Sequence, residues 1–189
     1  MVKNLVVIIH GLTGGGDQIW HPWLAEKLKD ENTTVLSPTF PDSCHPDFDS
    51  WNKMFLDILS SYNYDNLYLC GHSLGGFFSL KNMSDYLHKN EKLRGVVLVA
   101  PVTFYDKDRF HDLPFLSYDI DWDVLRTVKV PIKLLYSIDD PSVNHKHKDL
   151  LLKELSNFCN FEYIEFNHYK HFTNKQIDEI LIAMKEIIQ

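Results

Sequence analysis

The residues with the most distinctive chemical potential are Gly71-His72-Ser73-Leu74-Gly75, which match the pattern G-x-S-x-G. This spacing is typical of a sharp turn from a strand into a helix, with a nucleophilic serine at its apex in a strained backbone conformation. Glycines two positions before and after the serine leave room for the turn, because a side chain there would collide with the neighbouring strand or helix. The apolar run Asn66–Cys70 precedes the motif and a helical pattern follows it. We therefore predict that Ser73 is a nucleophile, rather than a serine that only caps the next helix.

A nucleophilic serine needs a base that accepts its proton and a third group that orients the base. After the serine, the next apolar run to end in carboxylates is Ile132–Ser137, which is followed by two aspartates. The run after that, Phe161–Phe166, is followed by two histidines. Chains with this serine turn carry the three groups in the order serine, acid, histidine, and the order is met here.

Each of these pairs leaves a choice. Of Asp139 and Asp140 we favour Asp140, because it begins a D-P-x-V pattern that is usual for the loop carrying the acid. Asp139 would then be a turn residue. Of His168 and His171 we favour His171, because it immediately precedes the segment that opens the last predicted helix. His168 would then be a surface or structural histidine. The predicted catalytic residues are therefore Ser73, Asp140 and His171.

Attack on a carbonyl creates an oxyanion, which backbone N–H groups can stabilise. One candidate donor is Leu74, directly after the serine, and the other is Leu12, with Thr13 as its alternative, in the loop after the first apolar run. We expect the substrate pocket to be walled by residues 12–23, 101–118 and 142–145, which are aromatic and apolar with few cations. This lining favours a small, uncharged or apolar acyl group as the substrate. The candidate pocket residues are Thr13, Trp20, His72, Val102 and Val143.

Short apolar runs alternate with longer amphipathic stretches along the chain. The runs are predicted strands at Asn4–His10, Thr33–Ser37, Asn66–Cys70, Gly95–Ala100, Ile132–Ser137 and Phe161–Phe166. Most are continuous apolar blocks, which are typical of parallel strands buried on both faces. The predicted helices are Gln18–Asp30, Phe48–Tyr62, Leu74–His88, Trp122–Thr127, Lys146–Phe158 and Asn174–Ile188. This alternation predicts a three-layer α/β fold, in which helices flank a mostly parallel central sheet of about six strands.

Length and composition limit the possible functions. A chain of 189 residues fits one domain, residues 1–189. Its 19 Lys and Arg against 26 Asp and Glu give a net charge of −7, so we expect no nucleic-acid partner. No apolar run approaches the length of a membrane span, so we expect no membrane association. Three cysteines without a C-x-x-C spacing indicate neither a disulfide scaffold nor structural zinc, and we predict a cytoplasmic protein.

The glycine-rich segment Gly11–Gly16 is not a phosphate-binding loop. Such a loop requires Lys and then Ser or Thr after its last glycine, whereas Asp17 and Gln18 stand there. The histidine pairs of the chain lack the nearby carboxylate that completes a zinc-protease helix motif. We therefore expect no cofactor and no metal ion.

Several segments together resemble the small serine hydrolases related to retinoblastoma-binding protein nine. They extend along nearly the whole chain and in order: 10–17, Trp20, Trp23, 41–42, 71–73, 97–100, 139–141, and 171–174. The resemblance implies a compact α/β-hydrolase fold without a large lid domain, and the triad Ser73, Asp140 and His171. The family's retinoblastoma partner is linked to an L-x-C-x-E motif. None of the three cysteines is followed two residues later by Glu, so we do not expect that partner.

Two functional classes are compatible with these observations. The first is a serine hydrolase, carboxylesterase-like, that cleaves small ester, thioester or amide substrates through an acyl-enzyme intermediate. The second is a non-catalytic protein-binding module on a hydrolase fold, since a fold alone does not guarantee an activity. The complete set of nucleophile, base and acid favours the enzyme, because a binding module has no need of all three.

Overall fold

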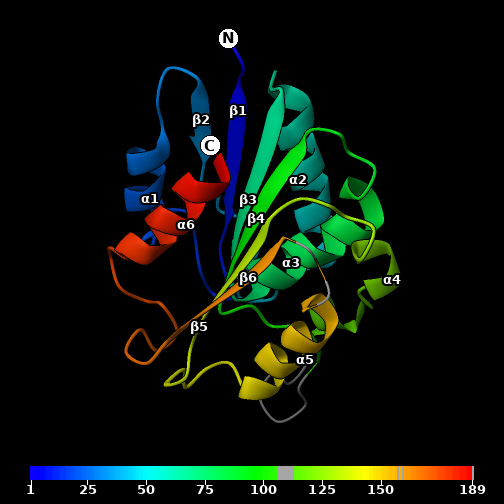
Figure 1. Ribbon diagram of the computed structural model, residues 1–189, viewed down its shortest axis with the longest axis vertical. Helices are drawn as coiled ribbons and strands as arrows, with labels where there is room; N and C mark the ends of the chain where they lie inside the picture. The colour runs from blue at the N-terminus through cyan, green and yellow to red at the C-terminus, as the bar shows by residue number, and fades with distance from the viewer. Residues whose placement is uncertain (106–112, 157, 159, 189) are drawn as a thin grey trace.

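A central sheet of six strands organises the computed structural model, which describes residues 1–105, 113–156, 158 and 160–188. The strand order is β2-β1-β3-β4-β5-β6, and the described pairings are all parallel (Figure 1). The predicted parallel sheet of about six strands is thus confirmed. The strands span β1 Asn4–Ile9, β2 Thr33–Leu36, β3 Asn66–His72, β4 Leu93–Val99, β5 Ile132–Ser137 and β6 Phe161–Phe166.

Helices cover both faces of the sheet. Figure 1 shows α1 and α6 together on one face, and α2 and α3 on the other. The α-helices span α1 His21–Leu28, α2 Phe48–Ser61, α3 Leu74–Asn82, α4 Trp122–Leu125, α5 His145–Leu155 and α6 Asp178–Ile188. A π-helical turn, Met83–Leu87, continues α3, and a 3₁₀ turn, Pro114–Ser117, precedes α4. No large lid domain interrupts this arrangement in the part of the chain that the structure describes.

The pleat of the strands divides the apolar residues into two hydrophobic cores. In β1, Leu5, Val7 and Ile9 face the core beneath α2 and α3, whereas Val6 and Ile8 face the core beneath α1 and α6. All five residues are at most 1% exposed. Burial on both faces explains why the sequence of this strand is a continuous apolar run, as the parallel-sheet interpretation required.

The two edge strands depart from that pattern. β6 is half-exposed, with Glu162 and Glu165 open to solvent, because only one of its edges has a neighbouring strand. Lys133 of β5 is 8% exposed and pairs with Glu162 of β6 and Glu186 of α6, which connects the edge strand to the last helix. A continuous buried run therefore describes the inner strands and not the edges.

Several predicted boundaries were wrong, and local backbone geometry explains the main differences. The predicted helix Gln18–Asp30 begins only at His21, because Ile19 has a φ of 46°, which a right-handed helix cannot accept. The last helix begins at Asp178 rather than Asn174. β3 continues two residues beyond Cys70 to His72, so the strand extends up to the serine itself. Residues 106–112 of the irregular segment 101–118 lie outside the described residues.

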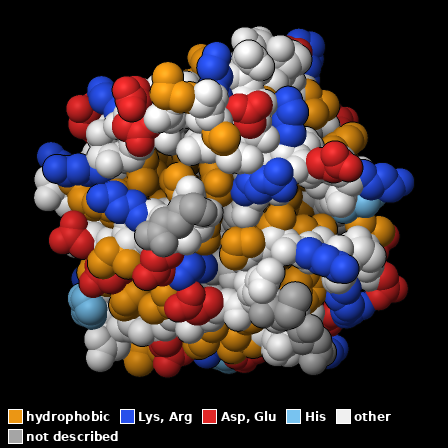
Figure 2. All heavy atoms as spheres, turned by 45° about the horizontal axis from the view of Figure 1, so that its top comes forward, with side chains coloured by type: hydrophobic (Ala, Val, Ile, Leu, Met, Phe, Trp, Pro, Cys, Tyr) orange, Lys and Arg blue, Asp and Glu red, His pale blue; other side chains and the backbone are white. Residues whose placement is uncertain are grey.

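The surface and the helices give further bounds. In the described part of the chain, no helix is both long and apolar enough to cross a bilayer. Figure 2 shows basic and acidic side chains interspersed on the face it presents, so this face has no broad surface of a single charge sign.

Cys70 is fully buried within β3, and burial raises the pKa of its thiol, which makes it unreactive.

Parallel strands bring their carboxyl ends to one edge of the sheet. The turn at Ser73 follows β3, and the loop with Leu12 follows β1. The loops carrying Asp140 and His171 follow β5 and β6. The topology therefore gathers the sequence-predicted site residues at this edge, although about a hundred positions separate Ser73 from His171 along the chain.

Candidate active site

Ser73 occupies a strained turn between β3 and α3. Its backbone has φ 53° and ψ −114°, a conformation that L-residues rarely adopt and that costs about 1–3 kcal/mol. Hydrogen bonds hold the turn: the Ser73 amide donates to Val99 O at 2.9 Å, and Ser73 O accepts from the amides of Gly76 and Val102 at 3.0 and 3.2 Å. The serine is 7% exposed, so its hydroxyl lies at the floor of a recess.

The glycines on either side of Ser73 are needed for close backbone approaches. A Cβ added to Gly71 would lie 2.4 Å from Gly75 O, and one added to Gly75 would lie 2.2 Å from Ile9 O. Both obstacles are backbone atoms, which cannot rotate aside as a flexible side chain can. The collision with the neighbouring helix and strand that the motif predicted is confirmed, and it explains the spacing of the two glycines.

A hydrogen bond joins Asp140 to His171. The distance between His171 Nδ1 and Asp140 Oδ2 is 2.8 Å. Because a carboxylate only accepts, Nδ1 carries the proton, and Nε2 is left as the acceptor. The other carboxylate oxygen, Oδ1, accepts from the amides of Ser142 and Val143 at 2.7 and 3.0 Å. Both oxygens of this fully buried carboxylate are thus fixed, which fixes the imidazole in turn.

The alternatives, Asp139 and His168, form no such pair. Asp139 Oδ1 accepts from Ser137 Oγ at 2.5 Å and from the Lys170 amide at 3.0 Å. The bond from the Ser137 hydroxyl is the main cause that lowers the pKa of Asp139. His168 is exposed, and its ring contacts Asn167 Oδ1 at 3.0 Å. The structure therefore brings Asp140 and His171 together, and gives Asp139 a role in shaping the loop.

The backbone donors separate the two candidates for the loop after β1. The Thr13 amide donates to Ser43 O at 2.7 Å, so it is already engaged. Within the described residues, the amides of Leu12 and Leu74 have no hydrogen-bond partner in the protein. The geometry therefore favours Leu12 over Thr13 as the second donor beside Leu74, which stands at the first position of α3.

A cavity of about 200 Å³ lies over Ser73. Its lining comes from the glycine-rich loop, the serine turn and the histidine loop: Gly11, Leu12, Thr13, Gly14, Gln18, Ile19, His21, His72, Ser73, His171 and Thr173. None of these side chains is an aspartate, glutamate, lysine or arginine. The cavity thus brings Ser73 and His171, the predicted nucleophile and base, together in a pocket whose described lining carries no Asp, Glu, Lys or Arg.

The predicted pocket residues are only partly found there. Thr13 and His72 line the cavity, whereas Trp20, Val102 and Val143 do not. Trp20 is fully buried, and its indole Nε1 donates to Phe172 O at 2.9 Å. Val102 and Val143 are each 1% exposed and pack in the core beneath α2 and α3. These three side chains belong to the two hydrophobic cores, and apolar type and chain position alone could not distinguish a core residue from one that lines the cavity.

Sequence reasoning did not single out Gln18, Ile19, His21 or Thr173 on the cavity wall. The first three lie within the segment 12–23 expected to contribute to the pocket. The positive φ of Ile19 breaks the predicted helix and turns this segment toward the cavity. Thr173 had no signal other than its place two residues after the histidine. Residues 113–118 and 142–145 contribute nothing to the described lining.

Three buried histidines surround the site, and all are held neutral. Burial is the main cause of a lowered pKa at all three. It lowers the pKa of His10, lowers that of His21 to about 4, and lowers that of His72 well below its usual value. Both ring nitrogens of His10 have hydrogen-bond partners. Nδ1 lies 2.8 Å from Gly11 O, and Nε2 accepts from the Phe40 amide at 2.8 Å. His21 Nδ1 lies 3.1 Å from Gly15 O. These rings therefore shape the loops as neutral groups and bring no positive charge to the surroundings of His171.

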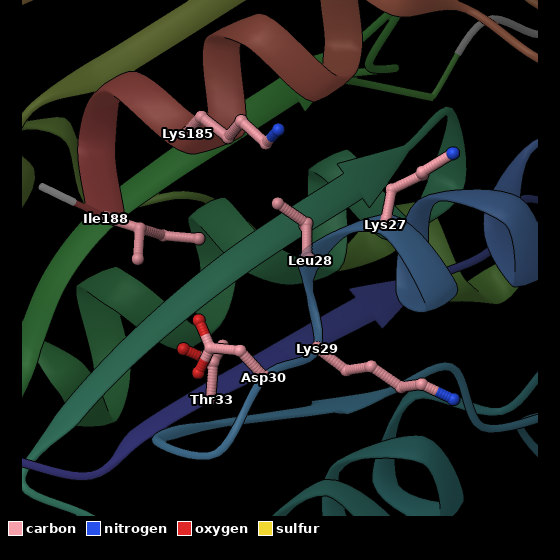
Figure 3. A pocket seen from close by; sticks show the side chains of 7 residues that line it. All are labelled: Lys27, Leu28, Lys29, Asp30, Thr33, Lys185 and Ile188. Atoms are coloured by element: carbon pink, nitrogen blue, oxygen red, sulfur yellow. The ribbon is translucent and has the colours of Figure 1, made fainter.

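Another cavity, of about 330 Å³, lies between α1 and α6 (Figure 3). Its wall includes Thr33, the first residue of β2, so it opens at the amino ends of the strands, away from Ser73. Its lining holds three lysines but no histidine, serine or cysteine. The described lining therefore lacks the serine–histidine combination found in the cavity over Ser73. Within the described residues, no group of three or more His, Cys, Asp or Glu is placed to hold a metal ion.

The parallel sheet, the strained serine turn and the acid–histidine pair define an α/β hydrolase. The model of the serine hydrolase family matches residues 6–175, and the chain belongs to this family. It is 32% identical over 98 residues to the hydrolase YdeN of Bacillus subtilis (strain 168), an alignment that covers 50% of this chain and 49% of YdeN. This sequence alignment thus spans about half the length of each of the two chains. The narrower resemblance to retinoblastoma-binding protein nine stays a prediction.

Solved structures agree with the fold. The ydeN gene product of B. subtilis superimposes with a TM-score of 0.80 at 18% identity, covering 99% of both chains. Est1E from Butyrivibrio proteoclasticus superimposes with a TM-score of 0.76 at 14% identity, over 99% of this chain and 88% of Est1E. The esterase EaEST from Exiguobacterium antarcticum superimposes with a TM-score of 0.75 at 11% identity, over 100% of this chain and 93% of EaEST. At these identities the likeness concerns the fold alone.

The neutral state of His21 predicts a stability that falls with acidity. The unfolded chain binds a proton at this histidine near pH 6.5, whereas the folded protein binds it only near pH 4. Between these values the unfolded state binds more protons, so the free energy of unfolding decreases as the pH falls, by up to about 3 kcal/mol from this group. We expect His21→Phe to flatten this decrease, as measured by urea unfolding at pH 7, 5.5 and 4.5. His45→Gln, at an exposed histidine, is the control and should keep the wild-type slope; an unchanged slope in His21→Phe would contradict the assignment.

Proposed function

We propose that this protein is an esterase-like hydrolase in which Ser73 is the nucleophile, His171 the general base and Asp140 the residue that orients the base. The observation that carries the proposal is the 2.8 Å bond between His171 Nδ1 and Asp140 Oδ2. It fixes the imidazole as the tautomer whose Nε2 can accept a proton, in a cavity that the base shares with Ser73.

The reaction follows from these positions. Ser73 Oγ attacks the substrate carbonyl while His171 Nε2 takes the hydroxyl proton, and the resulting imidazolium is stabilised by Asp140. The Leu12 and Leu74 amides donate to the oxyanion. Collapse of the tetrahedral intermediate breaks the ester bond, and His171 returns the proton to the leaving alcohol. Water then attacks the acyl-serine with His171 again as base, which releases the acid and restores the serine hydroxyl.

The cavity supports a small acyl group without charge. Its volume of about 200 Å³ lies below the roughly 300–1,000 Å³ of pockets for drug-sized ligands. Among the described residues, its lining has no Asp, Glu, Lys or Arg side chain that would pair with an ionic substrate. The esters among the proposed substrates gain support from Est1E, a fold relative determined with ferulic acid bound. We therefore propose short-chain esters, with thioesters and small amides as further members of the class.

Loss of the serine hydroxyl should abolish the activity. We expect Ser73→Ala to reduce the hydrolysis of p-nitrophenyl acetate and butyrate by at least about 10³-fold, because the acyl-enzyme cannot form. A fluorophosphonate probe should label the wild-type protein at this serine and leave the variant unlabelled. Thermal unfolding of both proteins checks that the variant is folded.

A folded wild-type protein that neither cleaves these esters nor reacts with the probe would contradict the proposed activity. The alternative of a non-catalytic binding module on a hydrolase fold would then take its place. Turnover of equal size in the wild type and in Ser73→Ala would contradict the assignment of the nucleophile.

Adjacent aspartates provide a matched pair of variants. We expect Asp140→Asn to reduce kcat by about 10³- to 10⁴-fold, because the amide can donate to Nδ1 and so favours the wrong tautomer of His171. Asp139→Asn keeps an oxygen that can accept from the Ser137 hydroxyl and the Lys170 amide, so its kcat should stay within about tenfold of wild type. Steady-state kinetics on one ester compares the two. A larger loss in Asp139→Asn than in Asp140→Asn would reverse the assignment.

A further inference from the structure

Two buried side chains donate hydrogen bonds to consecutive carbonyl groups of the histidine loop, residues 167–173. His72 Nε2 lies 2.9 Å from His171 O, and Trp20 Nε1 donates to Phe172 O at 2.9 Å. His72 is 5% exposed and Trp20 is fully buried. Phe172 has a φ of 54°, an uncommon conformation that needs support from its surroundings.

The protonation of His72 follows from its partner. A carbonyl oxygen only accepts, so Nε2 of His72 carries the proton. Ring contacts fix the direction of this N–H: the centroid of His72 lies 5.8 Å from that of Trp20, 5.9 Å from that of His21 and 4.8 Å from that of His171. Burial, with the nearby His171 and His21, lowers the pKa of His72 well below its usual value, so the ring stays neutral beside an imidazolium at His171.

The histidine loop is thus held from two sides. On the side of β5, the Tyr169 amide donates to Ser137 Oγ at 3.1 Å and the Lys170 amide donates to Asp139 Oδ1 at 3.0 Å. On the side of β3 and α1, the described hydrogen bonds to this loop come from His72 and Trp20. Asp140 fixes the rotation of the His171 ring, but a bond to Nδ1 does not by itself fix how far the backbone of the loop lies from the serine.

His72 is covalently joined to Ser73, so its bond to His171 O links the backbone of the nucleophile directly to the backbone of the base. A displacement of about 1 Å between reacting groups can cost on the order of 10²-fold in rate. The link therefore bears on the distance between Ser73 Oγ and His171 Nε2, the two atoms that exchange the proton.

We propose that His72 and Trp20 are positioning residues that clamp the backbone of His171 and Phe172 and thereby set the distance between the proposed nucleophile and base. The clamp rests on the proposed function, since it has a purpose only where Ser73 and His171 react together. It acts through hydrogen-bond donors and not through charge. A neutral replacement that donates from the same position should therefore serve in place of the imidazole.

The test compares two replacements of His72. We expect His72→Leu, which fills similar space without a donor, to lower kcat for p-nitrophenyl acetate by about 10- to 100-fold while KM changes less than about threefold. His72→Gln, whose amide N–H reaches about as far as Nε2, should recover most of kcat. Trp20→Phe, which keeps a ring but loses the N–H, should lower kcat about 3- to 10-fold. A role in folding alone would lower the thermal midpoint without this division between leucine and glutamine.

These variants separate the positioning role from the proposed activity. Equal kcat in His72→Leu and wild type, or equal losses in the leucine and glutamine variants, would overturn the clamp while leaving the proposed activity in place. A wild-type protein without turnover that depends on Ser73 would overturn the proposed function, and the clamp with it. If His72→Leu does not fold, His72→Gln and Trp20→Phe carry the comparison. Wild-type kcat in Trp20→Phe would then contradict the two-donor clamp.

Discussion

The backbone conformation of Ser73 is the constraint on which the rest of the structure depends. A φ of 53° with a ψ of −114° is unfavourable for serine and persists only because the surroundings allow no alternative. The Val99 carbonyl holds the serine amide, and α3 approaches β1 so closely that Gly75 has no room for a side chain. The parallel sheet supplies this framework. Strain at one residue is thus supported by hydrogen bonds and packing from β1, β4 and α3.

The same edge of the sheet collects the other groups. The loop after β1 carries the candidate donor Leu12, and the turn after β3 carries Ser73 and the other candidate donor, Leu74. The loops after β5 and β6 carry the carboxylate and the imidazole. Hydrogen bonds between the loops then fix their relative positions: His171 Nδ1 donates to Asp140, and His72 Nε2 donates to His171 O. Because burial lowers the pKa values of His10, His21 and His72, these three rings add no positive charge next to the imidazolium that forms on the proposed base.

How far the sequence determines this picture varies from element to element. The five-residue motif around Ser73 is enough to predict the sharp turn, because a side chain at either glycine would collide with neighbouring backbone. The continuous run of β1 likewise identifies a buried parallel strand. The start of α1 did not follow, because the positive φ of Ile19 depends on how the glycine loop folds back. Trp20, Val102 and Val143 were misplaced for a related reason: whether an apolar side chain lines or supports a cavity is decided by tertiary packing.

The proposed acid and base could be predicted only in part from the sequence. Their places after β5 and β6 leave two candidate aspartates and two candidate histidines, and likeness to known motifs favours one of each. The distances then distinguish them, since Asp139 is bound by Ser137 and Lys170 whereas Asp140 faces His171. The amide of Thr13 is similarly taken by Ser43 O, which only the folded chain reveals.

A crystal structure of the protein after reaction with a small phosphonate ester inhibitor would locate the nucleophile and the oxyanion donors together. We predict that phosphorus is bonded to Ser73 Oγ, with one phosphonyl oxygen within about 3 Å of the Leu12 and Leu74 amides and His171 Nε2 beside the serine oxygen. Phosphorus on another residue, or a phosphonyl oxygen that points away from both amides, would contradict it.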